Sequence, residues 1–248
     1  LARQLMRIAR FYHDGHIARA GRTALNAAAA HHARDVLRLR EGDSVTLFNS
    51  RDGEFSARIV YVDKRGVGVE VDAGIESLPE SPLDVTLGQA ISAGDKMDFT
   101  LQKAIELGVR AIQPLASERS VVKLSAERAE KRRLHWQAVA IAASEQSGRS
   151  YVAPVEPVRA LRDWLAAKPL DAIGIMLAPA AAIRLVALQR PAGPIWLLIG
   201  PEGGFSETEH AAATAAGFTA VALGPRILRT ETAALTALAA MQTLWGDF

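Results

Sequence analysis

Two glycine-proline loops carry the residues most suited to chemistry. The first loop is residues 200–204 (GPEGG), after the apolar run 195–199; the second is residues 224–232 (GPRILRTET), after residues 219–223. Each apolar run is short enough for a buried strand and too short for a core helix. Glycine permits positive φ and close approach of the backbone to a ligand. Since open α/β sheets bind ligands at the carboxyl ends of their strands, two such loops predict a binding site.

The charges of these loops narrow the ligand class. Neither loop contains G-x-G-x-x-G or G-x-x-x-x-G-K-[ST], the patterns that cradle phosphates. Glu202 lies inside the first loop and Glu231 at the head of the last helix. A carboxylate repels a phosphate and attracts a cationic sulfonium. Two alternatives remain: ordinary turns of a parallel sheet, and a nucleotide-binding enzyme that uses GPEGG as its phosphate loop.

The elements around the two loops are predicted from capping and periodicity. Ser206 and Glu209 fit a capping box, so a helix is expected to start there and to end at Gly217. A second helix is predicted over residues 233–245, with one apolar face made by Leu235, Leu238, Met241 and Trp245. Upstream, strands are predicted at residues 83–91, 109–115 and 173–177, alternating with helices near 97–105, 125–146 and 161–165. For residues 125–146 the predicted buried stripe is Leu134, Ala138 and Ile141. This alternation predicts a parallel sheet.

The first part of the chain has a different pattern. Short strands are predicted at 44–49, 54–63 and 67–72, separated by turn signals at 51–53 and 64–66, after a helix at 27–37. Together they predict a small β-barrel domain. Residues 73–82, with Gly, Ser and two prolines, are typical of a linker.

Composition excludes several classes of protein. The 248 residues contain no cysteine, which rules out disulfides, thiolate metal sites and a cysteine nucleophile. The six histidines show no metal-ligand spacing, and no apolar run is long enough to span a bilayer. Arg3, Arg7 and Arg10 interrupt the start, unlike a secretory signal. We therefore expect a cytoplasmic protein without a metal or a membrane anchor.

Positive charge is concentrated near the start of the chain. Residues 1–40 contain eight arginines against Asp14 and Asp35. A basic arm of this density suits contacts with nucleic-acid phosphates. A solvated surface explains the charge equally well.

The two loops also carry a family resemblance. Residues 198–206 (LIGPEGGFS) and 223–235 (LGPRILRTETAAL) resemble the signature loops of SPOUT-class methyltransferases. Within that class they resemble the enzymes that use S-adenosylmethionine to methylate N3 of a uridine in small-subunit (16S) ribosomal RNA. The resemblance runs from Met6 to the C-terminus and implies that Met6 is the natural start, with residues 1–5 an addition. A SPOUT methyltransferase with another RNA target, or a noncatalytic ribosome-binding factor, is the alternative.

The resemblance implies a fold that the sequence pattern alone does not predict. It implies an α/β SPOUT domain over residues 83–248 with a C-terminal trefoil knot, preceded by a PUA-like RNA-binding β-barrel at 1–72 and a linker at 73–82. Without it, the rule that chains are unknotted predicts a plain doubly wound sheet. In the family the knot gathers the three loops after the strands that end near Leu177, Ile199 and Leu223 around a bent cofactor. Family members also dimerise through this region, so a homodimer is expected.

Residue roles carried over from the family fall into three sets. Cofactor binding is expected of Leu177, Pro179, Ile199, Gly200, Pro201, Glu202, Gly203, Gly204, Leu223, Gly224, Ile227, Leu228, Thr230, Thr232 and Ala233. RNA binding, to free ribosomal RNA or to an assembled 30S subunit, is expected of Arg10, His32, Arg38, Arg119 and Arg226. The catalytic candidates are Arg229, Glu231, Arg149 and Glu145.

Uridine N3 carries a proton at neutral pH, so the site must remove it and stabilise charge that spreads onto the ring oxygens. Arg229, Arg226 and Arg149 are the candidate donors to those oxygens. Either Glu231 or Glu145 could be the base, and the sequence does not choose between them. An alternative for Arg229 is a structural ion pair with Glu231 or Glu202.

Overall fold

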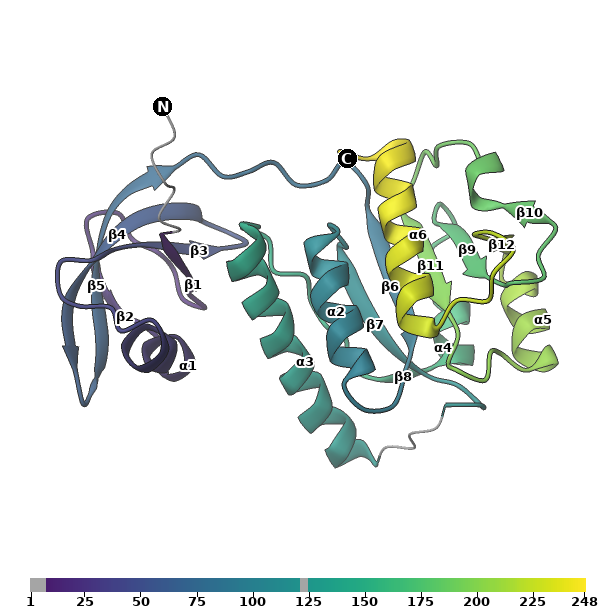
Figure 1. Cartoon of the computed structure of the whole chain (residues 1–248), viewed down its shortest axis with the longest axis horizontal. Coiled ribbons are helices and arrows are strands. Elements are labelled where there is room, and N and C mark those ends of the chain that lie inside the picture. The colour runs from purple at the N-terminus through teal and green to yellow at the C-terminus, as the bar shows by residue number, and fades with distance from the viewer. Residues whose placement is uncertain (1–7, 121–124) are drawn as a thin grey trace. The chain divides into compact units, whose positions relative to one another are not determined.

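The computed structural model describes residues 8–120 and 125–248 (Figure 1). The chain divides into two compact units. Unit 1 consists of Leu1–Pro79 with Ser144–Val152, and unit 2 of Glu80–Ala143 with Ala153–Phe248. The predicted start at Met6, and Arg3 and Arg7 of the predicted basic arm, lie outside the described residues.

Unit 1 is built on a five-stranded sheet in the order β1-β3-β4-β5-β2. Its strands are β1 (Ala9–Tyr12), β2 (Arg22–Ala24), β3 (Ser44–Asn49), β4 (Gly53–Asp63) and β5 (Gly66–Ile75). The pair β1–β3 is parallel and the other pairs are antiparallel. The three predicted strands are present, but β5 extends three residues into the predicted linker. The two short edge strands β1 and β2 were not predicted, because most of their residues are only partly buried or exposed and show no clear alternation.

The helix predicted at 27–37 is present but changes geometry midway. α1 (Ala27–His31) begins after Asn26, whose Oδ1 accepts a hydrogen bond from the Ala29 amide at 2.9 Å. The chain then continues as the π-helix η1 (His32–Val36). Two residues further on, Arg38 has a φ of 55°, which is unusual for a residue with a side chain. Arg38, which is predicted to bind RNA, therefore lies just after an irregular helix end.

A partly buried ion pair holds residues 144–152 in unit 1. Arg10 donates from Nη1 to Glu54 Oε2 at 2.6 Å and from Nη2 to the Arg149 carbonyl at 3.2 Å. The Ser150 hydroxyl also hydrogen-bonds Glu54. The side chains of Arg10 and Glu54 are only 17% and 5% exposed, and the guanidinium lies over the Phe48 ring. The arginines described between residues 8 and 40 therefore belong to a folded part of unit 1, where Arg10 is engaged by Glu54.

Unit 2 contains a parallel seven-stranded sheet in the order β10-β12-β9-β11-β6-β7-β8. The strands are β6 (Val85–Ala90), β7 (Ala111–Ala116), β8 (Arg159–Ala160), β9 (Ile173–Leu177), β10 (Ile183–Arg184), β11 (Ile195–Ile199) and β12 (Phe218–Ala222). The predicted α/β class and parallel sheet are confirmed. The two-residue strands β8 and β10 were too short to leave a periodic signal.

In the described residues, five helices and one 3-10 turn accompany this sheet. They are α2 (Lys96–Glu106), α3 (Ala126–Ser147), α4 (Leu161–Ala166), η2 (Leu185–Ala187), α5 (Glu207–Ala215) and α6 (Thr230–Trp245). The predicted capping box of Ser206 and Glu209 is present at the start of α5. The predicted start of α6 at residue 233 is wrong, because the helix begins at Thr230 with Arg229 as its N-cap residue.

The predicted buried stripe of α3 is also wrong. Leu134 is 56% exposed, whereas Trp136, Ala140 and Ala143 are almost completely buried. The Trp136 indole donates to Asp98 Oδ1 at 3.1 Å, and His135 Nε2 lies 2.6 Å from Asp98 Oδ2. Asp98 belongs to α2. These contacts turn the Trp136 side of α3 toward the core, although the spacing of apolar residues in the sequence predicted the Leu134 side.

The last helix packs back on the middle of the sheet. β9 lies between β11 and β12, yet α6, which follows β12, packs against β11, α2 and η2 (Figure 1). The chain therefore returns past β9 to reach the middle of the sheet. This return brings the first turn of α6 to the end of β11.

Aromatic packing fixes the opposite face of the sheet. Trp164 of α4 stacks on Trp196 of β11, with ring centroids 4.4 Å apart, and Phe218 lies beside them. The ring of Trp164 occupies the space where a Cβ at position 88 would stand, so β6 carries Gly88 there. No helix in the described ranges is long and apolar enough to cross a membrane.

Arg10→Met is expected to lower the free energy of unfolding by about 3–5 kcal/mol, because it leaves the Glu54 carboxylate buried without its partner. Far-UV circular dichroism during denaturation measures the loss. The matched control is Arg22→Met, whose partner Glu70 is exposed, and which should cost at most about 1 kcal/mol. Equal losses for the two variants would contradict the structural role of Arg10.

Candidate functional site

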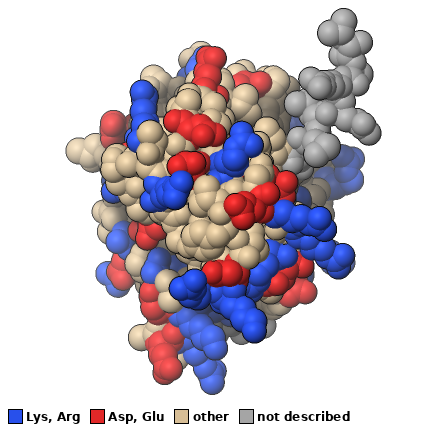
Figure 2. Space-filling model, turned by 90° about the vertical axis from the view of Figure 1, so that its left-hand side faces the viewer, with Lys and Arg blue, Asp and Glu red and all other residues tan. Residues whose placement is uncertain are grey.

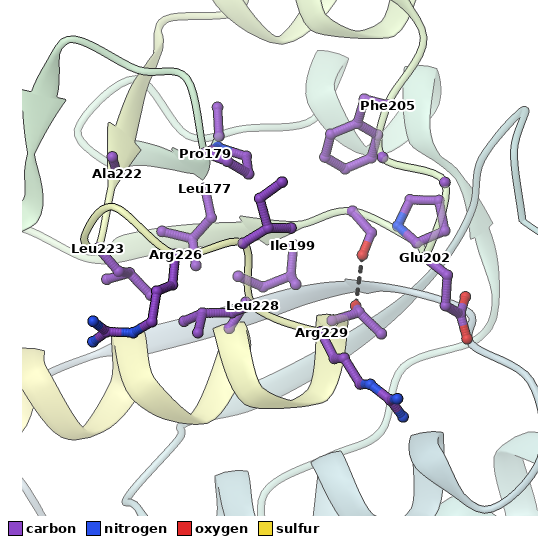
Figure 3. Close-up of a pocket in the computed structure, with 18 of the residues that line it drawn as sticks. Leu177, Pro179, Ile199, Glu202, Phe205, Ala222, Leu223, Arg226, Leu228 and Arg229 are labelled. Carbon is purple, nitrogen blue, oxygen red and sulfur yellow. Dashed lines mark hydrogen bonds between the residues drawn. The ribbon is translucent and has the colours of Figure 1, made fainter.

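A pocket of about 650 Å³ opens at the carboxyl ends of β9, β11 and β12 (Figure 3). Three loops form it: one after Leu177, one after Ile199 and one after Ala222. This volume is in the range of roughly 300–1,000 Å³ typical of small-molecule sites. The pocket therefore lies where the loop pattern of the sequence predicts a ligand.

Most residues predicted to bind a cofactor line this pocket. They are Leu177, Pro179, Ile199, Gly200, Pro201, Glu202, Gly203, Gly204, Leu223, Gly224, Ile227, Leu228, Thr230 and Ala233. Arg226, predicted to bind RNA, and Arg229, predicted to be catalytic, also line it. Thr232 is not on the wall and is exposed in the first turn of α6. The sequence reasoning missed Lys96, Ala178, Phe205, His210, Val221 and Ala222. Ala178 and Phe205 directly follow Leu177 and Gly204, so the sequence could have placed them in the predicted cofactor site. Nothing in the sequence marks His210.

The pocket has an apolar middle and a cationic margin. Leu177, Ile199 and Leu228 converge in the centre of Figure 3, while the guanidinium groups of Arg226 and Arg229 point outward. Such a slot fits a flat, largely apolar ring system. The arginines are placed to contact a second, negatively charged molecule at its edge.

The first loop is held by hydrogen bonds and by one glycine. The Thr230 hydroxyl donates to the Gly200 carbonyl at 2.6 Å, which is the dashed line of Figure 3. Gly204 has a φ of +66°, whereas Gly203 has no positive φ. A Cβ at position 204 would meet no atom within 4 Å, so its constraint is conformational and not steric.

Glu202 is paired with a lysine that the sequence reasoning missed. Lys96 Nζ lies 3.1 Å from Glu202 Oε1, and the Ala93 amide donates to the same oxygen. Partial burial raises the pKa of Glu202, but the hydrogen bonds from backbone amides and Lys96 outweigh it and hold the pKa below its ordinary value. The carboxylate thus stays ionised and joins the loop after β6 to the first pocket loop.

The N-terminus of α6 faces the pocket without a side-chain cap. Its N-cap residue is Arg229, which makes no capping hydrogen bond to the first-turn amides. The positive end of the helix dipole adds to the charge of the arginines. Within residues 8–120 and 125–248 Arg229 forms no ion pair with Glu202 or Glu231. The alternative in which Arg229 only holds the loop therefore has no support in this geometry.

Glu231 is partly buried beside this helix end. Its Oε2 is buried and has no hydrogen-bond partner among the described residues, and its side chain is not on the pocket wall. A carboxylate in this state can accept a proton or a hydrogen bond after a small rearrangement.

Arg119 connects the loop after β7 to the pocket. Its Nη1 donates to the carbonyls of Gly203 at 3.1 Å and Phe205 at 3.4 Å. Glu209 Oε1 accepts from the Glu118 amide at 2.7 Å, so the capping residue of α5 also fixes this loop. The exposed Arg119 is therefore held at the pocket mouth.

The remaining predicted site residues belong to unit 1. Glu145 Oε1 accepts from the Tyr12 amide at 3.0 Å, and the guanidinium of Arg149 lies over the Tyr151 ring. His32 packs edge-on against Phe11, while Arg38 is exposed. Figure 2 shows one face of the molecule, on which Lys and Arg side chains lie among Asp and Glu and are most numerous in the lower half. The residues that line the pocket all belong to unit 2.

Comparison with known proteins assigns both parts of the chain. The protein-family model described as "RNA methyltransferase domain" matches residues 79–242, and the family model described as "RNA methyltransferase PUA domain" matches residues 25–72. The ribosomal RNA small subunit methyltransferase E of Buchnera aphidicola (strain APS) is 34% identical over 218 residues, covering 88% of this chain and 86% of that protein. The Bacillus subtilis protein of the same name is 32% identical, with 90% and 92% covered.

Solved structures agree with these matches. The ribosomal RNA small subunit methyltransferase E of Neisseria gonorrhoeae, bound to S-adenosyl methionine, is 44% identical with a TM-score of 0.91, covering 97% of this chain and 99% of that one. A putative methyltransferase from Legionella pneumophila, in complex with the same cofactor, is 37% identical with a TM-score of 0.94, covering 98% and 100%.

The fold and the pocket define a PUA-containing α/β RNA methyltransferase. Within that class, the chain belongs to the ribosomal RNA small subunit methyltransferase E family. The resemblance stated from the two loop motifs is thereby confirmed.

Glu145→Gln is expected to stabilise unit 1 at neutral pH. Burial raises the pKa of Glu145, opposed by the Tyr12 amide, His32 and Arg10. The folded state thus binds this proton more tightly than the unfolded state, so stability falls as pH rises from 4.5 through the raised pKa. The amide keeps an acceptor for Tyr12 without that penalty. The melting temperatures of Glu145→Gln and of the wild type should therefore move apart as pH rises from 4 to 8. A constant difference between them would contradict a raised pKa of Glu145 in the folded protein.

Proposed function

We propose that this protein transfers the methyl group of S-adenosylmethionine to N3 of a uridine in small-subunit ribosomal RNA. The observation that carries the proposal is the pocket built by the two signature loops and the loop after β9, with its apolar middle and cationic margin. The Neisseria relative that is bound to S-adenosyl methionine supports the cofactor. The name shared by the curated relatives supports the RNA.

The pocket residues fit this cofactor. Leu177, Ile199 and Leu228 offer a slot for the adenine ring, and the glycines of residues 200–204 allow backbone groups to approach it closely. When bound, the cofactor supplies an electrophilic methyl group on a sulfonium. We also propose that the return of α6 past β9 passes through a loop and makes a trefoil knot. Homodimerisation is part of the same proposal.

The chemistry asked of the protein is the stabilisation of negative charge. As N3 loses its proton and gains the methyl group, charge spreads onto the uracil oxygens. Arg229 and the uncapped amides of α6 can donate to such an oxygen, as an oxyanion hole does. Glu231, with its unpaired buried oxygen, is one candidate for the base, and Glu145, whose pKa is raised by burial, is the other. Arg149 and Arg226 are the further candidate donors.

The RNA is proposed to contact both units. Arg119 and Arg226 stand at the pocket mouth, and Arg38 with His32 belongs to the helix end of unit 1. Arg10 contributes by holding the unit together, because its guanidinium is already engaged by Glu54. We keep residues 1–72 as the proposed RNA-binding domain, 83–248 as the methyltransferase domain and the cytoplasm as the compartment. The substrate is ribosomal RNA, free or in the 30S subunit.

The direct test is incubation of the protein with S-adenosylmethionine that carries a labelled methyl group, together with 30S subunits or extracted small-subunit RNA. Mass spectrometry of the digested RNA should find the label on N3 of uridine. A label on another atom would refute the position. Cofactor binding without any transfer to RNA would favour a noncatalytic ribosome-binding factor.

Gly204→Ala is expected to weaken cofactor binding by about tenfold or more. An alanine resists the positive φ of position 204, so the loop must shift. Gly42→Ala is the matched control, because position 42 also has a positive φ and open space around a Cβ but belongs to unit 1 and does not line the pocket. Isothermal titration with S-adenosylmethionine should separate the two variants. Similar affinities for both would remove Gly204 from the binding site.

Arg229→Ala is expected to lower the single-turnover methylation rate by about a hundredfold or more, the loss typical of one oxyanion donor. Arg229→Lys should recover only part of the rate, because an ammonium lacks the planar pair of donors. Affinities for cofactor and RNA are measured beside the rate. A normal rate at saturation, combined with weakened cofactor binding, would assign Arg229 to binding instead.

A further inference from the structure

We infer that Gln89, which is not on the pocket wall, is a positioning residue for S-adenosylmethionine binding; this inference rests on the proposed function. Gln89 lies on β6 beside Ile199 of β11 and is completely buried. Its side chain is the inner end of a hydrogen-bonded chain that reaches both signature loops. Gln89 Nε2 donates to Thr230 Oγ1 at 3.0 Å, and Thr230 Oγ1 lies 2.6 Å from the Gly200 carbonyl.

The direction of each hydrogen bond in this chain is determined. The short contact to Gly200 requires the single hydroxyl proton of Thr230, since a carbonyl can only accept. The hydroxyl must therefore accept from Gln89, which has to present its NH₂ group. A second contact, from Nε2 to the Ala90 carbonyl at 3.0 Å, fixes the same orientation of the amide. Gln89 thus orients the Thr230 proton toward the end of β11.

This hydrogen-bonded chain connects the two signature loops across 30 residues of sequence. Gly200 begins the first signature loop, and Thr230 is the first residue of α6 at the end of the second. Both line the pocket. A loss of the Gln89 bond frees the Thr230 hydroxyl to rotate, so the two loops lose their fixed spacing. Cofactor affinity should suffer more than the fold.

An unsatisfied atom argues that Gln89 does not serve stability. Its Oε1 is buried and has no hydrogen-bond partner in the described part of the chain. A buried acceptor without a partner is destabilising, and an apolar side chain of similar shape would avoid that cost. An apolar substitution of Gln89 is therefore expected to weaken cofactor binding while it leaves the stability of the fold unchanged or raises it.

Gln89→Met is the first test, in the full-length protein. Methionine is similar in shape and flexible enough to fill the site. We expect the Kd for S-adenosylmethionine to rise about tenfold, the scale of one lost buried hydrogen bond, with an unchanged or higher melting temperature of the ligand-free protein. Saturated kcat should change little. An unchanged Kd, or a Kd that rises only together with a lowered melting temperature, would overturn the inference.

Gln89→Glu gives a pH readout that a packing role would not produce. A protonated carboxyl can donate to Thr230, whereas an ionised one cannot. Burial raises the pKa of a carboxyl group at such a position. Relative to wild type, cofactor affinity of this variant should be near normal at low pH and fall as pH rises through that pKa. A constant ratio of the two affinities across pH would overturn the inference.

Thr230→Val and Thr230→Ser complete the set. Valine should reproduce the loss seen for Gln89→Met, serine should not, and the double variant Gln89→Met/Thr230→Val should lose no more than either single variant. Additive losses of affinity would show that Gln89 and Thr230 do not act through one hydrogen-bonded chain, and would overturn the inference. Wild-type protein that fails to bind S-adenosylmethionine would overturn the proposed function, whereas normal wild-type binding with a normal Gln89→Met variant would overturn this inference alone.

Discussion

The hydrogen bond from Thr230 to the Gly200 carbonyl is the contact on which the site depends. It joins the end of a central strand to the beginning of the last helix, although β12 lies two strands away from β11. The return of α6 to the middle of the sheet makes this contact possible, and the pocket is the space that the return leaves. Residues that are distant along the chain therefore form one binding wall.

Much of this arrangement can be predicted from local signals. Strands β3, β9 and β11 coincide with apolar runs between turn residues, and the capping box of α5 is present as predicted. The loop motifs place most pocket residues, because glycine and proline mark where a backbone must turn near a ligand. These features depend on neighbours in sequence, which is why sequence patterns detect them.

What could not be predicted depends on contacts between distant residues. Arg10 looked like a free cation, and only the folded chain brings Glu54 and residues 144–152 to it. The buried face of α3 is chosen by Asp98, a residue of another helix. Lys96 lines the pocket and pairs with Glu202, which lies 106 residues further along the chain. In each case a polar partner far along the chain outweighed local periodicity or charge.

The two helices that follow the signature loops begin differently, and this difference makes the stability of the fold depend on ligand concentration. At the start of α5, Ser206 accepts from the Glu209 amide and Glu209 accepts from the Ser206 amide, whereas Arg229 at the start of α6 makes no capping hydrogen bond. A pocket ligand that accepts hydrogen bonds from the first-turn amides of α6 would add to the stability of that helix. Resistance to unfolding should therefore increase with ligand concentration, by about 2.7 kcal/mol at a hundred times Kd. All four tryptophans lie in unit 2, so their fluorescence would report this ligand-dependent stability without a signal from unit 1.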